Sequence, residues 1–399
     1  MKTHPADTPT ARLAHATMPQ TPEFLPPIPP RAPIDTALLS DTERLHRIYL
    51  RPEITPHPTD PELVRLTVAR PVHSPTETAV LYLNALTHMN RERVTEFALE
   101  RHGEWHVGSW YIPAHLHTSA GIILCDPLDP AIGHERATWR TALDSAVPLV
   151  PVPNMEAFTE LQPAAGFPDI TNPLHQSRWH SAALDVEVRA WLSPDPSPHA
   201  TLLLMTDAEE YLNRTPLLPR LRTPEHPATS VLFFGPASSS NRDRVLTAGP
   251  ALDSFIEKEL LPWAARFSPP LADSSQRIIA GGSLGGFAAA GVVRRRPDLV
   301  PNAVVQSASF WWPDRSYAEL AAWDAEIDPR VRVFHEVGAY EGFLRAENRR
   351  FAHLLAQRVA PGAWHSREYQ GGHDYACWRK GILDALDWFH AQDKTYKMI

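Results

Sequence analysis

The sequence predicts an α/β protein in two parts, a small all-β sandwich domain followed by a three-layer α/β domain. Two observations support this. Between residues 61 and 133, short apolar or alternating runs such as LVRLTVARPV and TAVLYLNAL are separated by Pro, Gly and charged turns, which is typical of β-strands. After residue 175, strand-like runs alternate with helical segments, which indicates parallel βαβ units.

The whole chain has 399 residues and 43% hydrophobic side chains, enough for more than one core. We assign residues 1–45 to a flexible Pro-rich arm, 46–150 to the sandwich domain, 151–175 to a linker and 176–399 to the catalytic α/β domain. The arm and the linker are predicted from their proline content and weak hydrophobic periodicity. No internal repeat is evident.

Charge and composition narrow the classes of partner. The formal net charge is −8 and no long Lys/Arg run is present, which argues against nucleic acid or an anionic membrane surface. Cys125 and Cys377 match no zinc or redox spacing, and we expect both to be buried apolar side chains. The N-terminus lacks an apolar signal region and no segment is long enough to span a bilayer, so a cytoplasmic protein is expected. The sequence does not indicate an oligomeric state.

The most informative stretch is QRIIAGGSLGGFAAAGVV. An apolar strand, 277–280, leads into a G-x-S-x-G match at 281–285 and then into a helix expected to end near Arg296. A strained turn between strand and helix has little room for side chains, which explains glycines on both sides of Ser283. A Gly-rich turn of this kind also occurs in phosphate loops, but no P-loop lysine is present. The pattern predicts Ser283 as the nucleophile of an α/β-hydrolase.

In this class the chain order is serine, acid, histidine. WHSREY reads as the last strand and 371–374 as the following loop, which predicts His373 as the general base. The turn after the preceding strand offers Glu341 as the acid. Glu336 lies within that strand and is the other acidic residue near this turn. The alternative to a catalytic role for Glu336 is a structural hydrogen bond. Three other carboxylates are weaker candidates for the acid: Asp314, Asp328 and Asp374. An esterase that works with a Ser–His pair alone is a further alternative.

The oxyanion of a tetrahedral intermediate needs backbone N–H donors where charge develops. One donor is expected to be Leu284, at the start of the helix. The second should follow the early strand TLLLM, at Asp207 or Ala208.

Across most of residues 60–399, the chain resembles the enterochelin (ferric enterobactin) esterases. The resemblance rests on WHVGSWYIP and CDPLDP in the first half and on ELLPW, GGSLGGF, SASFWWPD, EVGAYE and GGHDYACWR in the second. By this resemblance Ser283 and His373 take the catalytic roles and Glu341 falls on the second acidic position of the family's E-x-G-x-x-E pattern. One departure lies in SNRDRVL, where Val245 replaces a usual acidic residue between Arg242 and Leu246.

The resemblance implies a ferric catecholate siderophore as substrate, a trianion with planar rings that favours arginines and aromatic faces. For each candidate, packing in the core or exposure on the surface is the alternative explanation. The candidates are Arg242, Arg315, Arg379, Trp311, Trp312 and Trp378.

We therefore expect hydrolysis of trilactone ester bonds through an acyl-enzyme. No cluster with metal-ligand spacing is evident, so no metal site or cofactor is predicted, and iron would arrive bound to the substrate. Two alternatives remain: a general carboxylesterase or acyltransferase of the same fold, and a siderophore-binding protein without catalysis.

Overall fold

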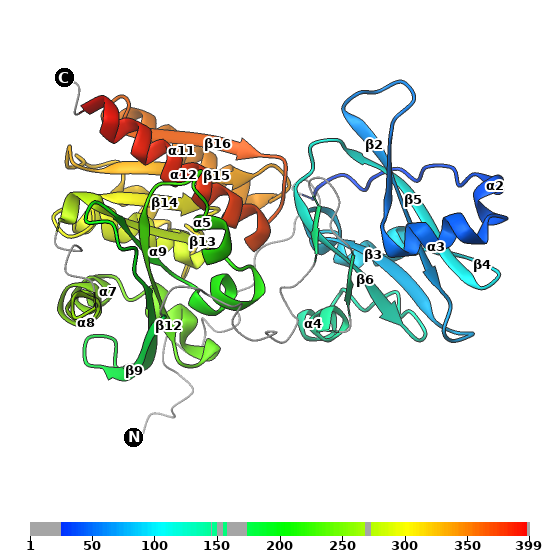
Figure 1. Cartoon of the computed structure of the whole chain (residues 1–399), viewed down its shortest axis with the longest axis horizontal. Helices are drawn as coiled ribbons and strands as arrows, with labels where there is room; N and C mark the ends of the chain where they lie inside the picture. The colour runs from blue at the N-terminus through cyan, green and yellow to red at the C-terminus, as the bar shows by residue number, and fades with distance from the viewer. Residues whose placement is uncertain (1–24, 145, 150–154, 158–173, 268–272, 397–399) are drawn as a thin grey trace.

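The computed structural model describes residues 25–144, 146–149, 155–157, 174–267 and 273–396. The predicted linker lies largely outside this part of the chain. Figure 1 shows the described residues as two domains side by side, one mainly of strands and one with helices on both faces of a sheet. No helix in the described residues is long and apolar enough to cross a membrane.

The N-terminal domain contains two β-sheets that enclose one core. The first sheet is antiparallel, with the order β1-β2-β5-β4, and the second contains β3, β6, β7 and β8. Leu66 and Trp110 of the first sheet and Leu81 and Ile122 of the second belong to one buried cluster. The strands are β1 (Glu53–Pro56), β2 (Leu63–Pro71), β3 (Thr78–Leu83), β4 (Glu100–His102), β5 (Trp105–Pro113), β6 (Thr118–Cys125), β7 (Val147–Pro148) and β8 (Met155–Ala157).

Residues 25–45 correct the prediction of a flexible arm over 1–45. Proline removes an N–H donor, so a Pro-rich segment is tolerated at a sheet edge, and here Tyr111 donates to the carbonyl of Pro30 along β5. Helices α2 (Thr36–Leu39) and α3 (Thr42–Leu50) follow. Their Leu38, Leu45 and Ile48 pack in a small apolar cluster that offsets the cost of ordering the segment. Residues 1–24 lie outside the described part. The other helices of this domain are η3 (Asn84–His88), η4 (Arg91–Phe97) and α4 (Arg136–Asp144).

The C-terminal domain is built on an eight-stranded sheet with the order β16-β15-β14-β13-β11-β12-β10-β9. From β12 to β16 the neighbouring strands are parallel, whereas β10 is antiparallel to both β12 and β9. The strands are β9 (His175–Ser181), β10 (Val186–Ser193), β11 (Thr201–Met205), β12 (Thr229–Pro236), β13 (Arg277–Gly282), β14 (Asn302–Gln306), β15 (Arg332–Gly338) and β16 (Trp364–Tyr369).

Helices cover both faces of this sheet, which confirms the predicted three-layer fold. Successive residues of β13 show the two faces: Ile279 packs in the cluster that includes α9 and α11, whereas Ile278 packs in the cluster that includes α12. The helices are η5 (Glu210–Arg214), α5 (Leu218–Leu221), η6 (Ser239–Asn241), α6 (Arg242–Leu246), α7 (Pro250–Phe255), η7 (Ile256–Leu260), α8 (Leu261–Ala265), η9 (Ser274–Gln276), α9 (Leu284–Arg295), α10 (Ala318–Ala322), α11 (Phe343–Arg358) and α12 (Tyr375–Tyr396).

The two domains are joined by polar contacts at the loop between β16 and α12. The carboxylate of Asp374 accepts hydrogen bonds from the backbone N–H of Ser119 (2.6 Å) and from its hydroxyl (2.8 Å). The backbone N–H of His117 donates to the carbonyl of Gln370 at 2.7 Å. The edge of β6 therefore supports the loop that carries His373.

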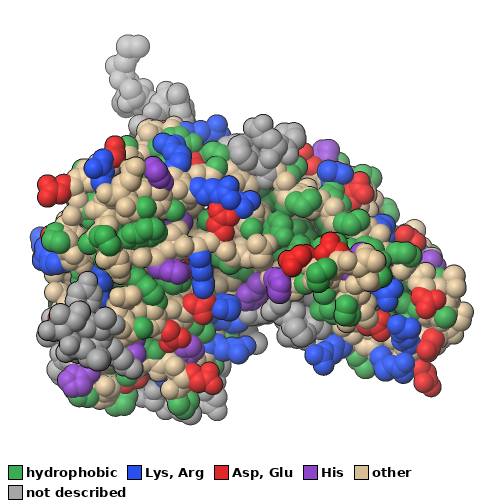
Figure 2. All heavy atoms as spheres, turned by 90° about the horizontal axis from the view of Figure 1, so that it is seen from above, with side chains coloured by type: hydrophobic (Ala, Val, Ile, Leu, Met, Phe, Trp, Pro, Cys, Tyr) green, Lys and Arg blue, Asp and Glu red, His purple; other side chains and the backbone are tan. Residues whose placement is uncertain are grey.

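Charged side chains of both signs lie on the face of the molecule that Figure 2 shows. In the space-filling view of Figure 2, Lys and Arg side chains on the visible face are interspersed with Asp and Glu.

Candidate active site

Ser283 occupies a sharp turn between β13 and α9. Its backbone has φ 60° and ψ −120°, a strained conformation for a residue with a side chain. The turn is crowded, because a Cβ atom on Gly286 would lie 2.7 Å from the carbonyl oxygen of Gln306. Its geometry is that of the predicted nucleophile elbow, which presents the serine hydroxyl at the carboxyl edge of the sheet.

The hydroxyl of Ser283 rests against a second serine. Its Oγ lies 3.1 Å from the Oγ of Ser309, in the segment after β14. The backbone N–H of Ser309 also donates to the carbonyl of Ser283, at 3.1 Å. Ser309 thus contacts both the main chain and the side chain of the elbow.

His373 and Glu341 form the closest acid–base contact at this edge of the sheet. The Nδ1 of His373 lies 2.7 Å from Oε2 of Glu341. The other carboxylate oxygen, Oε1, accepts hydrogen bonds from the backbone N–H of Gly338 (2.7 Å), the hydroxyl of Tyr369 (3.0 Å) and the hydroxyl of Ser307. Glu341 is buried, with 1% of its surface exposed. These hydrogen bonds compensate the buried charge of Glu341 and orient its second carboxylate oxygen toward the imidazole of His373.

Trp378 supports the imidazole ring from the side. Its indole meets the ring of His373 edge-on, with centroids 4.6 Å apart, and its Nε1 donates to the hydroxyl of Ser307 at 3.0 Å. Only 1% of Trp378 is exposed. The side chain fills the space between the histidine loop and the elbow, since a Cβ on Gly282 would lie 2.4 Å from it. Packing thus accounts for Trp378, and its contact with substrate stays a prediction.

The remaining carboxylates considered as the acid have other partners. Glu336 is buried against Arg367 (2.8 Å) and Gln306 (2.7 Å). Asp374 contacts Ser119 of the N-terminal domain, as described above. Asp328 pairs with Arg330, and Asp314 accepts from the N–H of Ser316. Glu341 is the candidate among them that the structure brings to His373.

The predicted oxyanion donors lie on two elements that meet at the elbow. Leu284 begins α9. Asp207 follows β11 with a φ of 55°, and Ala208 is buried beside it. The two segments touch, because a Cβ on Gly285 would lie 2.3 Å from Oγ1 of Thr206. The predicted oxyanion donor of Asp207 is its backbone N–H. Its side-chain carboxylate pairs with Arg242 at 2.5 and 2.8 Å.

A pocket adjoins these donors. The pKa of Arg242 is raised above its usual value. Burial alone would lower this pKa, but the effect of the neighbouring Asp207 carboxylate is larger. Arg242 is thus a fixed cation whose charge is already balanced. The lining residues are Trp191, Asp207, Ala208, Glu209, Glu210, Gly235, Pro236, Ser239, Arg242 and Tyr375.

The other residues predicted to bind substrate differ in accessibility. Trp311 and Trp312 are 7% and 9% exposed and form a small apolar cluster that Leu284 contacts. Their cluster therefore adjoins the turn that carries Ser283. Arg315 is exposed on the same loop, whereas Arg379 is 7% exposed. Within the described residues no group of three His, Cys, Asp or Glu side chains is arranged to hold a metal ion.

Comparison with known proteins agrees with this geometry. Residues 238–389 match the family model described as putative esterase. The iron(III) enterobactin esterase of Dickeya dadantii (strain 3937) is 28% identical over 295 residues, which is 68% of this chain and 66% of that protein. The chain is therefore similar to iron(III) enterobactin esterases over about two thirds of its length. The iron(III) enterobactin esterase of Escherichia coli K12 is 25% identical over 268 residues, 62% of this chain and 64% of that protein.

Solved structures of enterochelin esterases share the fold. The Shigella flexneri enterobactin esterase, determined in the presence of enterobactin, superposes with a TM-score of 0.71 and 19% identity, covering 88% of this chain and 99% of that one. The aligned regions of the two curated relatives above span about two thirds of the length of those proteins. The structural likeness shows that this chain has the same two-domain α/β fold.

Several residues of this candidate site were not predicted from the sequence. Ser307 and Tyr369 bind the carboxylate of Glu341, and Ser309 contacts Ser283. One signal was present: Ser307 and Ser309 come directly after β14 (Asn302–Gln306). Because the carboxyl ends of parallel strands meet at one edge, side chains after this strand lie beside the elbow.

Proposed function

We propose that this protein is a serine esterase that hydrolyses the trilactone ester bonds of a catecholate siderophore in the cytoplasm. The observation that carries the proposal is the acid–base pair of Glu341 and His373 (2.7 Å) on loops beside the strained Ser283. The names of the relatives, iron(III) enterobactin esterases, supply the substrate class.

In this mechanism Ser283 Oγ attacks the ester carbonyl while His373 accepts its proton through Nε2. Glu341 holds the imidazole by Nδ1 and stabilises the imidazolium. The backbone N–H groups of Leu284 and of Asp207 or Ala208 bind the developing oxyanion. Proton transfer from His373 releases the alcohol, and water then hydrolyses the acyl-enzyme by the reverse use of the same base.

Cutting the ring separates the three catechol arms, which lowers their effective concentration around iron and weakens the chelate. In this proposal iron is part of the substrate and the protein supplies no cofactor. The oxygen-rich chelate, and not the protein, binds the metal.

The test is chromatographic analysis of the products formed from ferric and iron-free enterobactin by the wild-type protein and by Ser283→Ala. We expect linear trimer, dimer or monomer only with the wild type. Cleavage of simple acyl esters through Ser283, with no cleavage of enterobactin, would instead support a general carboxylesterase. Tight binding of the siderophore with no turnover would support a binding protein.

A further inference from the structure

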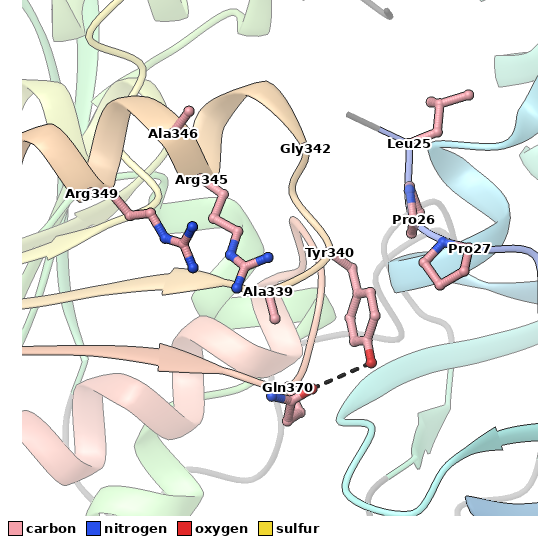
Figure 3. Close-up of a pocket in the computed structure, with 10 residues that line it drawn as sticks. All are labelled: Leu25, Pro26, Pro27, Ala339, Tyr340, Gly342, Arg345, Ala346, Arg349 and Gln370. Carbon is pink, nitrogen blue, oxygen red and sulfur yellow. Dashed lines mark hydrogen bonds between the residues drawn. The ribbon is translucent and has the colours of Figure 1, made fainter. Parts of the chain in front are cut away.

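A second pocket lies between the two domains, next to the loops that carry the acid and the base. Its walls come from three segments: residues 25–27 of the N-terminal domain, the turn 339–342 with the start of α11, and Gln370 before the histidine loop. In Figure 3, Arg345 and Arg349 extend from α11 on one side, Leu25, Pro26 and Pro27 lie on the other, and Tyr340 stands between them.

The pocket adjoins the proposed catalytic pair through the backbone. Tyr340 directly precedes Glu341, and its N–H donates to the carbonyl of Gly371 at 3.0 Å. Its hydroxyl lies 3.3 Å from Oε1 of Gln370, three residues before His373. A molecule bound here would therefore lie against the same two loops that hold Glu341 and His373.

The electrostatics of the pocket favour an anion. Arg345 and Arg349 are its charged lining residues in the described part of the chain, and both pair with the single carboxylate of Glu368. Two cations against one anion leave an excess of one positive charge. The Nε and Nη2 groups make these bonds, whereas Nη1 of each arginine has no hydrogen-bond partner among the residues that the structure describes.

The pocket also has apolar faces suited to a ring. The side chain of Tyr340 is only partly buried, and the pyrrolidine rings of Pro26 and Pro27 line the opposite side. Guanidinium groups bind planar anions with two parallel hydrogen bonds and stack on aromatic rings. The combination of guanidinium donors, a phenol ring and prolines is suited to an aromatic ring that carries negative charge.

We propose that this pocket, which we call the Arg345–Arg349 pocket, binds a catecholate ring of the substrate that is not attached to the ester being cut. The inference rests on the proposed function, because it assigns a place to a second arm of the same molecule. Holding that arm positions the trilactone over Ser283 and makes the enzyme prefer multi-armed anionic substrates to simple esters.

The ion pairs that Arg345 and Arg349 make with Glu368 allow the positive charge of the pocket to be both lowered and raised by substitution. Such exposed pairs contribute little to stability, so the substitutions should leave the fold intact. Arg345→Gln with Arg349→Gln removes the excess positive charge, whereas Glu368→Gln increases it by one. A purely structural role of the three residues would make both changes act in the same direction. Arg358→Gln, in the same helix and paired with Asp324, is the matched control.

KM is to be measured for enterobactin and for p-nitrophenyl butyrate, which has no anionic ring and sets the baseline for each variant. We expect the ratio of the two KM values to rise at least about tenfold in the double arginine variant and to fall in Glu368→Gln. Arg358→Gln should leave the ratio at the wild-type value. An unchanged ratio in the double variant, or equal shifts for both esters, would overturn the proposal.

Direct binding separates this inference from the proposed function. Calorimetry with 2,3-dihydroxybenzoyl-serine and the Ser283→Ala protein needs no turnover. If the wild type does not cleave enterobactin, the proposed function fails, yet loss of calorimetric binding in the double arginine variant still supports an aromatic-anion pocket. Equal binding by the Ser283→Ala protein with and without the arginine substitutions rejects the pocket.

Discussion

Ser309 Oγ lies 3.1 Å from Ser283 Oγ, so one hydrogen bond orients the hydroxyl of the proposed nucleophile. The same residue anchors the elbow through its N–H. One hydrogen bond thus selects a side-chain rotamer in a backbone conformation that is itself strained.

We expect Ser309→Ala to lower kcat about fivefold with little change in KM, since a hydrogen bond of about 1 kcal/mol that orients the hydroxyl is lost. The rate of labelling by a fluorophosphonate reports the nucleophile without substrate binding. That rate should fall in parallel. A labelling rate equal to that of the wild type would show that Ser309 has no positioning role.

Glu341→Gln tests the proposed catalytic acid. We expect kcat to fall by roughly 10²–10⁴, because an orienting carboxylate fixes the histidine tautomer and stabilises its charged form. Glu336→Gln is the matched control: its carboxylate contacts Arg367 and Gln306, so it should reduce stability more than kcat. If Glu336→Gln abolished turnover while Glu341→Gln retained it, the two assignments would have to be exchanged.

Asp374→Ala tests the link between the domains. The change leaves the buried N–H of Ser119 without its acceptor, which costs roughly 1–3 kcal/mol of folding free energy. Because Asp374 follows His373, we expect kcat to fall as well. Ser119→Ala removes only the hydroxyl bond and should have the smaller effect on both urea unfolding and kcat. Equal stability of the Asp374→Ala and wild-type proteins would argue against this link.

Glu347 makes stability depend on pH. It is 3% exposed, so its carboxylate is largely shielded from water. Burial raises its pKa to about 7, although Tyr317, Arg350 and Arg315 lower it. The folded state therefore binds the proton more tightly than the unfolded state, and stability is lost as pH rises through the interval from the unfolded pKa to about 7.

Glu347→Gln removes this ionisation. The variant should gain stability relative to the wild type by on the order of 2 kcal/mol more at pH 8 than at pH 5. Urea unfolding of both proteins at the two pH values measures the difference. A stability difference that is the same at pH 5 and pH 8 would mean that Glu347 does not titrate in this range.

The parts of the site that the sequence predicted are those with a local pattern. Ser283 was found because a strained turn between strand and helix requires glycines next to it. Glu341 remained one of several acids, because its selection depends on Gly338, Ser307 and Tyr369 converging on one carboxylate. Such convergence of distant residues leaves no periodic trace in the sequence.

The same reason explains what else the sequence did not predict. Trp378 has an aromatic ring of the kind that binds other rings. Its burial depends on the close approach of Gly282, a contact between residues far apart in the sequence. The pairing of Arg242 with Asp207 joins residues 35 apart. The Pro-rich residues 25–45 looked unable to pack because their partners, in β5, belong to a later part of the chain.

The contact between Ser119 and Asp374 spans 255 residues of sequence. We expect a contact of such separation to form late in folding, because closing a long loop costs conformational entropy before the contact can stabilise the chain. We therefore expect the loop that carries His373 to be fixed only after the two domains have docked. A chain in which the two domains have not docked would carry the strained turn at Ser283 without a supported histidine loop.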